Sequence, residues 1–405
     1  MQRTELFSPL QIGPLTLRNR SIRAAAFEGM CKNHEISQEL INYHTSVAEG
    51  GIGMSTVAFS AVSQQGLLYP HQLLLNDDAI HGLINLSTSI QSEGALASIQ
   101  IGHSGKLAKW RITNKRPVSS TSTFKLKDFT WVKEMTLKNI LEVLVDFQNA
   151  VRVAAEGNFD AVEIHAGHGY LIHQFLSPYT NKRKDAYGGS FKNRSRFLKE
   201  VLQAVKEVLP PHMALIVKMN IDDGFAEGIQ EDEVVKTAKL IEENGADAII
   251  PTGGTMCKTP LFIMKGNFSL NVLKYYQGIK NALLPSILKD ENFKPFEFKE
   301  AFFLDKAKLV KKAVNIPVVL LGGLHSKESI DHAFKENFDA VALGRPLIRN
   351  PHFINDLKAE SCTKSTCTKC NFCLAKVLNS SADCYLNEKE NIPNHLVSEI
   401  ESFAN

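Results

Sequence analysis

The sequence predicts an α/β fold in which eight parallel strands close into a (β/α)8 (TIM) barrel. Short apolar runs rich in β-branched residues alternate with longer segments of helical period, a pattern typical of a parallel sheet covered by helices. Eight such runs are the number that closes a barrel. No G-x-G-x-x-G follows the first run, where an open, doubly wound sheet usually carries it. The predicted strands are 21–27, 51–61, 95–103, 160–166, 214–220, 246–254, 316–323 and 339–346.

All eight runs are short and mainly apolar. "SIRAAAF", "GIGMSTVAFSA" and "ALASIQIGH" open the series, "DAVEIHA" and "ALIVKMN" follow, and "ADAIIPTGG", "IPVVLLGG" and "DAVALGRP" close it. Helix-like stretches such as "TLKNILEVLVDFQNAVRVAAEGN" and "SRFLKEVLQAVKEVLP" lie between them. Two inserts interrupt this rhythm, at about 105–134 and 255–303, and both follow the carboxyl end of a strand. Because a barrel keeps its active site at those ends, we expect a lid or a substrate wall there, with simple loop packing as the alternative for the distal half of the second insert.

Composition indicates a globular protein with a sizeable core. Of the 405 residues, 44% are hydrophobic and 22% are charged. The net charge of +3 comes from basic residues spread along the chain, so nothing favours nucleic acid as a partner. The start carries no apolar leader and no segment is long enough to cross a bilayer, so we expect no membrane partner. Seven cysteines in such a chain indicate a reducing compartment, and we expect a cytoplasmic protein, whose oligomeric state stays open, a homo-oligomer included.

The strand ends carry side chains that bind ligands and move protons. In a barrel the carboxyl ends of all eight strands meet at one pocket. The third strand ends near Gln100, the fourth runs into His165, His168 and Tyr170, and the fifth carries Lys218. A lone histidine on an apolar strand is more often a satisfied core residue. Two at spacing i, i+3 beyond a strand end, with a tyrosine two residues further on, favour an active site.

Glycines at the last two strand ends favour a phosphate-bearing ligand. The loops after strands seven and eight form the usual phosphate site of such barrels. Gly322–Gly323 and Gly344 allow close approach, and the guanidinium of Arg345 can fork onto phosphate oxygens. Either loop alone would more often be a simple turn. Together with an amide (Gln100) for a pyrimidine-like edge and a cation (Lys218) for a ring that becomes negative, they suit flavin mononucleotide, FMN.

The block "VEIHAGHGYLIHQFLSPYTNKRKDAYGGSFKNRSRF" (162–197) closely resembles the signature of the Old Yellow Enzyme family, the FMN-dependent ene-reductases and NAD(P)H:flavin oxidoreductases. The likeness extends to "LRNRSIRAAAFEGM" (17–30), "IQIGHSGKLA" (99–108), "IPVVLLGG" and "AVALGRP", and so covers about residues 5 to 350. It implies the barrel, FMN, and NADH or NADPH as the reductant of a small-molecule acceptor with an activated C=C bond. Quinones, nitro compounds, dienoyl substrates or an oxidative demethylation are the alternatives, and a barrel without turnover that acts as a sensor is a third class.

The resemblance also implies roles for single residues. Tyr170 would protonate the substrate, and His165 and His168 would grip its carbonyl oxygen. The cofactor residues would be Ala24, Ala25, Ala26, Gln100, Lys218, Gly322, Gly323, Gly344 and Arg345. The sequence departs from the family pattern at two of them. Lys218 stands where the family commonly has arginine, so a bidentate contact is lost, and Ala26 stands where many members offer a hydroxyl or a thiol.

The chain ends in a cysteine-rich segment. "CTKCNFCLAKVLNSSADC" places Cys367, Cys370, Cys373 and Cys384 close enough in sequence for a tetrahedral zinc or a [4Fe–4S] cluster. The motif is similar to one that ligates a [4Fe–4S] cluster in larger relatives, such as dienoyl-CoA reductase and trimethylamine dehydrogenase, with slightly longer spacing there. Cluster, zinc and metal-free thiols all stay open, because spacing alone fixes no metal. We expect a barrel domain over 1–355 and a cysteine-containing extension over 356–405, packed on or beside it.

Overall fold

The structure is a computed structural model that describes residues 5–125, 129–277 and 294–403, and its centre is a closed parallel barrel. The sheet order is β11-β10-β9-β5-β4-β3-β13-β12, and a parallel bridge between Ile249 and Val318 joins the two end strands. All eight predicted strands are therefore confirmed, in the predicted order. They are β3 (Ser21–Arg23), β4 (Met54–Ala61), β5 (Leu96–Gly102), β9 (Ala161–Ala166), β10 (Ala214–Asp222), β11 (Ala248–Gly253), β12 (Val319–Leu321) and β13 (Ala340–Leu343).

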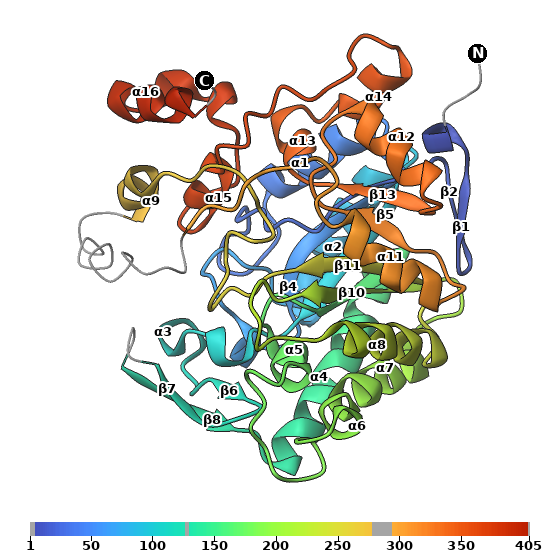
Figure 1. Cartoon of the computed structure of the whole chain (residues 1–405), viewed down its shortest axis with the longest axis vertical. Helices are drawn as coiled ribbons and strands as arrows, with labels where there is room; N and C mark the ends of the chain where they lie inside the picture. Colours follow the sequence, from blue (N-terminus) through green and yellow to red (C-terminus); the bar gives the residue numbers. More distant parts are fainter. Residues whose placement is uncertain (1–4, 126–128, 278–293, 404–405) are drawn as a thin grey trace.

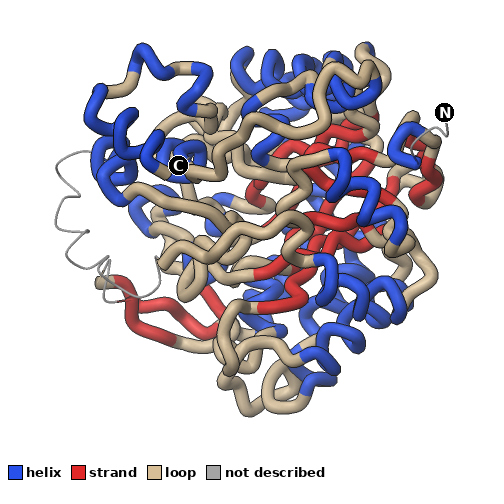
Figure 2. Tube along the Cα trace, turned by 45° about the horizontal axis from the view of Figure 1, so that its top comes forward, coloured by secondary structure: helices blue, strands red, loops and turns tan. Residues whose placement is uncertain are grey.

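Helices surround the strands, as Figure 2 shows for the described residues. Local sequence fixes where several of them begin: Ser37, Thr136 and Ser326 each accept a backbone N–H at a helix start. Among the described residues, no helix has both the length and the apolar character needed to cross a bilayer. The helices packed on the barrel include α1 (Gln38–Glu49), α2 (Ile80–Ser92), α4 (Leu137–Glu156), α7 (Arg196–Val208), α8 (Glu231–Glu243), α11 (Leu304–Ala313), α12 (Lys327–Lys335), α13 (Arg345–Arg349) and α14 (Phe353–Lys358).

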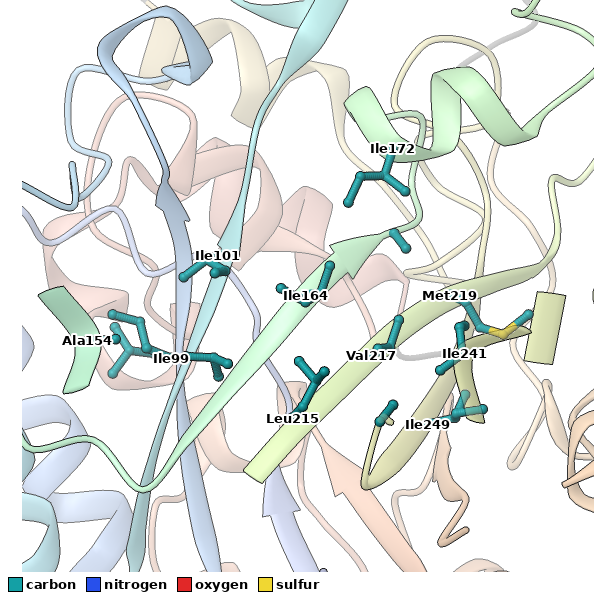
Figure 3. Close-up of a cluster of buried hydrophobic side chains, with 14 of the residues drawn as sticks. Ile99, Ile101, Ala154, Ile164, Ile172, Leu215, Val217, Met219, Ile241 and Ile249 are labelled. Atoms are coloured by element: carbon teal, nitrogen blue, oxygen red, sulfur yellow. The ribbon is translucent and has the colours of Figure 1, made fainter. Parts of the chain in front are cut away.

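Alternation along the strands builds two apolar layers. Outward side chains pack between the strands and the helices, as the labelled Ile99, Ile164 and Val217 do with Ala154 and Ile241 in Figure 3. Inward side chains fill the barrel lumen with a second cluster, which includes Ala161, Ala214, Ile216, Ala248 and Ile250.

A short hairpin closes the amino end of the barrel. Its two strands, β1 (Leu10–Ile12) and β2 (Leu15–Leu17), add Ile12, Leu15 and Leu17 to the lumen cluster. The lumen is therefore apolar at its amino end, and the polar inward residues stand toward the carboxyl ends of the strands. The fold thus leaves one face of the barrel for chemistry.

The first insert forms a small sheet of its own, of order β6-β8-β7. Its strands are β6 (Val118–Ser119), β7 (Thr123–Lys125) and β8 (Thr130–Glu134), preceded by α3 (Trp110–Thr113). Trp110 and Trp131 are exposed on it. The second insert contains α9 (Leu270–Gln277), and much of its distal half lies outside the described residues.

The C-terminal extension joins α9 to form a separate apolar cluster. This cluster includes Val272 and Leu273 from α9, Phe372 from α15 (Phe372–Val377), and Leu396 from α16 (Asn394–Ser402). In Figure 1 α9, α15 and α16 gather on the side of the molecule away from the β1–β2 hairpin. The boundary predicted after residue 355 falls inside α14, whose Asn355 N–H donates to the Gly50 carbonyl. The helix that crosses the boundary therefore packs against the barrel.

Candidate active site

One cavity at the carboxyl ends of the strands brings together every residue predicted for catalysis and cofactor binding. Part of its wall comes from the C-terminal extension, through Cys373, Leu374, Val377, Leu378 and Ala382. The predicted residues that line it are Ala24, Ala25, Ala26, Gln100, His165, His168, Tyr170, Lys218, Gly322, Gly323, Gly344 and Arg345. Residues far apart in sequence thus share one site because parallel strands end on one face.

Two of these side chains converge on a buried carboxylate that sequence reasoning missed. The Lys218 ammonium lies 2.7 Å from Oε1 of Glu163, and the Gln100 amide donates to the same oxygen at 2.5 Å. All three side chains are inaccessible or nearly so. They come from the neighbouring strands β5, β9 and β10.

His165 and His168 form a linked pair at the end of β9. Nδ1 of His168 lies 3.1 Å from Nε2 of His165, and its Nε2 lies 2.9 Å from the Thr252 hydroxyl. The Gly167 N–H donates to Nδ1 of His165 at 3.3 Å, which assigns the proton of a neutral His165 ring to Nε2. His168 has a φ of 55°, and its own N–H donates to the Asn220 side chain at 2.9 Å.

Both rings are neutral. Burial is the main cause that lowers the pKa of His165 well below its usual value, and the charges of His168, Lys218 and His173 add to it. Burial, with Lys218 and His173, does the same for the pKa of His168. Because the Thr252 hydroxyl can donate to Nε2 of His168, the proton of that ring can stand on Nδ1. The N–H groups of the two neutral rings can then face one acceptor in the cavity without bringing a positive charge into it.

Tyr170 follows directly, as the residue before α5 (Leu171–Leu176). Its ring packs against Phe59, with centroids 4.7 Å apart, and edge-on to His165 at 4.6 Å. Burial raises the pKa of Tyr170 well above its usual value of 10, with smaller contributions from Tyr69 and Cys257. The phenol therefore keeps its proton throughout the neutral range.

A second buried carboxylate, that of Asp223, is linked to His168 through Asn220. Asp223 accepts hydrogen bonds from Asn220 at 2.8 Å and from Ser177 at 3.1 Å, and it lies 2.9 Å from Nε2 of His173. Burial opposes its charge, but His173 and the hydrogen bonds outweigh burial and lower the pKa of Asp223 to about 2. Since Asn220 also receives the His168 N–H, this network fixes the turn that carries His168.

The Ala24–Ala26 segment is held by another network that sequence reasoning missed. The Arg23 guanidinium donates to the Ala26 carbonyl at 2.7 Å and contacts the Glu28 carboxylate at 2.6 Å. Glu28 in turn accepts the Ala58 N–H at 3.1 Å and lies 3.2 Å from Nε2 of His44. Three methyl side chains in a rigid segment leave room for a flat ring against the backbone.

The glycines of the two predicted phosphate loops differ in the space around them. Gly322 and Gly323 have φ values of 112° and 77°, and a Cβ on either would meet Phe303 or Lys299 at under 3 Å. Packing of the second insert alone thus explains both of them. A Cβ on Gly344, in contrast, would meet no atom within 4 Å, so this backbone faces open space.

Arg345 gives that space a cationic wall, and His325 lies in the same wall. The guanidinium is anchored by donation to the Lys265 carbonyl at 2.9 Å and to the Asn371 side chain at 2.8 Å. His325 is buried in the cavity wall, and its Nδ1 has no partner among the described residues. Burial and the nearby Arg345, Lys369 and Lys364 lower the pKa of His325 to about 2. An unpartnered nitrogen beside a guanidinium and open backbone fits a phosphate group.

The four C-terminal cysteines lie near one another, and their role as metal ligands stays a prediction. Cys367, Cys370 and Cys384 lie near enough to raise the pKa of Cys373, after burial, which is the larger cause. Among the described residues, however, no three His, Cys, Asp or Glu side chains come together as metal ligands must. Cys370 instead belongs to the apolar cluster of the extension, between left-handed turns at Lys369 and Asn371.

The chain is similar to known proteins over most of its length. A sequence model of the NADH:flavin oxidoreductase / NADH oxidase family matches residues 5–363. A 4,4'-dithiodibutanoate disulfide reductase from Rhodococcus erythropolis is 35% identical, over 92% of this chain and 93% of its own length. An NADPH dehydrogenase from Geobacillus sp. is 32% identical, over 86% of this chain and 92% of its own.

Solved structures show the same fold. An Old Yellow Enzyme homologue from Zymomonas mobilis superimposes with a TM-score of 0.70 at 21% identity, covering 89% of this chain and 94% of its own length. A 2-naphthoyl-CoA reductase superimposes with a TM-score of 0.80 at 24% identity and covers 95% of this chain, which spans 57% of that longer protein. The family match over most of the chain, with a 35% identical relative of nearly equal length, shows that the chain belongs to the NADH:flavin oxidoreductase / NADH oxidase family, whose members work with FMN and NAD(P)H.

Proposed function

We propose that this protein uses NAD(P)H and FMN to reduce the activated C=C bond of α,β-unsaturated carbonyl compounds. The observation that carries the proposal is the contact of Tyr170 with His165 in one cavity, where two neutral N–H donors and one protonated phenol stand together. Reduction of such a bond requires polarisation of the carbonyl group and a proton for the α-carbon. The three side chains supply these two functions.

His165 and His168 hold the carbonyl oxygen of the substrate in this scheme. Negative charge grows on that oxygen as the β-carbon is reduced, and aligned N–H donors stabilise it. Loss of one such donor typically costs about 10² to 10³ in rate. The Asn220–Asp223 network keeps His168 in place, so its donor is oriented before the substrate arrives.

Tyr170 is the general acid. Its pKa stays well above 10 because the ring is buried, so the phenol is protonated whenever the substrate binds. A positioned acid of this kind contributes about 10² to 10⁴ in rate. Phe59 holds the ring at its face, at a centroid distance of 4.7 Å, and limits its rotation.

Bound FMN would supply hydride transfer from the nicotinamide to the substrate. The residues that would hold its ring are Ala24, Ala25, Ala26, Gln100 and Lys218, whereas Gly344 and Arg345, with Gly322 and Gly323 beside them, would hold its phosphate. The open backbone at Gly344 and the unpartnered nitrogen of His325 support this direction of binding. His325, which was not predicted from the sequence, is therefore a further residue of the proposed phosphate site.

Reduction of a small organic disulfide is the second candidate. It is favoured by the relative from Rhodococcus erythropolis, a 4,4'-dithiodibutanoate disulfide reductase 35% identical over 92% of this chain. Two electrons and two protons convert one S–S bond into two thiols. In this reaction Tyr170 would give a proton to the first sulfur that leaves, and His165 and His168 would face sulfur rather than a carbonyl oxygen.

A single-turnover experiment separates the two reactions. FMN-loaded protein is reduced without oxygen by one equivalent of NADH or NADPH, and the return of the oxidised flavin spectrum is followed after addition of 2-cyclohexenone or 4,4'-dithiodibutanoate. We expect the enone to reoxidise the flavin at least ten times faster than buffer alone. If only the disulfide does so, the second candidate replaces the first, and a protein that takes up no FMN contradicts both.

A further inference from the structure

Glu163 does not line the cavity, but its carboxylate contacts two side chains that do. Its Oε1 receives both the Lys218 ammonium, at 2.7 Å, and the Gln100 amide, at 2.5 Å. Glu163 itself is fully buried and does not line the cavity, whereas both of its partners do. The carboxylate can therefore act on a ligand in the cavity only through Gln100 and Lys218.

Strand register explains how one carboxylate reaches both partners. Glu163 of β9 pairs with Gln100 of β5 on one side, and His165 pairs with Lys218 of β10 on the other. Side chains two residues apart on a strand share a face, so Glu163 points into the lumen just below His165. Lys218 lies at the level of His165, and its long side chain reaches back toward the amino end of the sheet to the level of Glu163.

Stability alone does not account for this arrangement. A buried ion pair recovers little more than its desolvation cost, and replacing such a pair by apolar residues is often neutral or stabilising. Here the second carboxylate oxygen, Oε2, also has no hydrogen-bond partner among the described residues, which adds to the cost. Toward the amino ends of the strands the lumen is filled by an apolar cluster, so an apolar residue would suit position 163.

We propose that Glu163 is a positioning residue that sets the charge and the donor pattern presented to FMN. Its negative charge offsets the Lys218 ammonium, so the floor of the cavity has a net charge near zero. An unbalanced ammonium beside the ring would favour the reduced cofactor, which carries more negative charge. Glu163 therefore keeps the reduction potential of bound FMN low enough for electrons to move on to the substrate.

The same contact fixes the orientation of the Gln100 amide. Because a carboxylate only accepts hydrogen bonds, the group that faces Glu163 must be the NH2 of Gln100. The carbonyl oxygen and the second N–H of the amide are then left for the ring. A pyrimidine edge offers one donor beside an acceptor, which is the complement of that pair.

The inference rests on the proposed position of FMN in the cavity, and a measurement of potential on the FMN-loaded protein tests it. Glu163→Gln keeps the size of the side chain and removes its charge. The matched control is Glu233→Gln, which removes the partner of the buried Arg194 on the outer helices, away from the cavity residues. We expect E163Q to favour reduced over oxidised FMN at least tenfold more than the wild type, a rise of about 30 mV for a two-electron couple. We expect no such rise in E233Q.

The possible results separate this inference from the proposed function. FMN-loaded E163Q with the potential of the wild type contradicts the role of Glu163 and leaves the alkene chemistry untouched. Wild-type protein that binds no FMN contradicts the placement of the cofactor. If E163Q does not fold, Glu163→Asp, which draws the carboxylate back by one methylene group, is expected to raise the potential in the same direction but less. An unchanged potential in that variant also contradicts the proposal.

Discussion

The side-chain oxygen of Asn371 accepts a 2.8 Å hydrogen bond from the guanidinium of Arg345. The same amide donates to the carbonyls of Met264, at 2.6 Å, and Asn267, at 2.9 Å. One residue thus joins the C-terminal extension, the second insert and the end of the last barrel strand. The extension is therefore part of the cavity wall, and it also holds the guanidinium that we assign to the phosphate.

Loss of the Asn371 side chain should weaken cofactor binding. Asn371 has a φ of 56°, so Asn371→Gly removes the three hydrogen bonds without adding backbone strain. Each buried partner left unsatisfied costs about 1 to 3 kcal/mol, and we expect the free energy of unfolding to fall by about 2 to 4 kcal/mol. Since Arg345 also loses its anchor, we expect the dissociation constant of FMN, measured by fluorescence titration of apoprotein, to rise at least tenfold.

The control for this variant is Asn337→Gly. Asn337 also has a left-handed backbone, with a φ of 65°, but it is exposed at the end of α12. We expect FMN affinity to stay at the wild-type value there. Equal affinity in the Asn371 and Asn337 variants would show that the extension does not support the phosphate site.

Replacing Tyr170 by phenylalanine should slow one half-reaction only. The ring and its packing on Phe59 remain, but the buried proton is lost. We expect anaerobic enone reduction by reduced protein to slow by about 10² or more, the contribution of a positioned acid. Reduction of the flavin by NAD(P)H should stay within about twofold, because that step needs no proton from the phenol.

Stopped-flow absorbance of the two half-reactions checks this prediction. Tyr187→Phe is the control, since that phenol donates to Glu200 at 3.0 Å and does not line the cavity. It should leave both half-reactions unchanged. If Tyr170→Phe slows both half-reactions equally, the residue shapes the cavity and is not the acid.

The eight barrel strands and the residues at their carboxyl ends could be predicted from the sequence, because both follow from local patterns. Apolar runs indicate parallel strands, and polar side chains such as His165 at their ends indicate the face of the barrel that carries the site. Glu163 was missed for the opposite reason. It lies inside an apolar run, and its partners Gln100 and Lys218 are 63 and 55 residues away, so only the register of three strands reveals the contact. Arg23 and Glu28 escaped notice in the same way.

The cysteine motif shows what spacing alone leaves open. Four thiols within a short stretch predicted ligands, but among the described residues no three ligand side chains come together, and Cys370 packs in an apolar cluster. We therefore expect purified protein to contain less than one iron per chain and to show only flavin bands in the visible range. Iron analysis and an absorption spectrum check this. About four irons per chain, lost in Cys367→Ser and kept in the exposed Cys257→Ser, would contradict it.

Stability should fall as the solution becomes acidic, in part through His103. Burial lowers the pKa of His103 from 6.5 to about 3. Between these two values the unfolded chain binds a proton that the folded chain does not, so stability is lost as pH falls below 6.5. One such proton changes the free energy of unfolding by about 1.4 kcal/mol per pH unit.

His103→Asn removes this contribution and keeps an acceptor for the Gly105 N–H, which Nδ1 of His103 receives at 2.9 Å. We expect urea unfolding of apoprotein between pH 6 and pH 4.5 to show a pH slope smaller than that of the wild type by about 1.4 kcal/mol per unit. His81→Asn removes an exposed imidazole and serves as the control, with the wild-type slope. Equal slopes in wild type and His103→Asn would mean that the folded protein protonates His103 as readily as the unfolded chain, and that water reaches this end of β5.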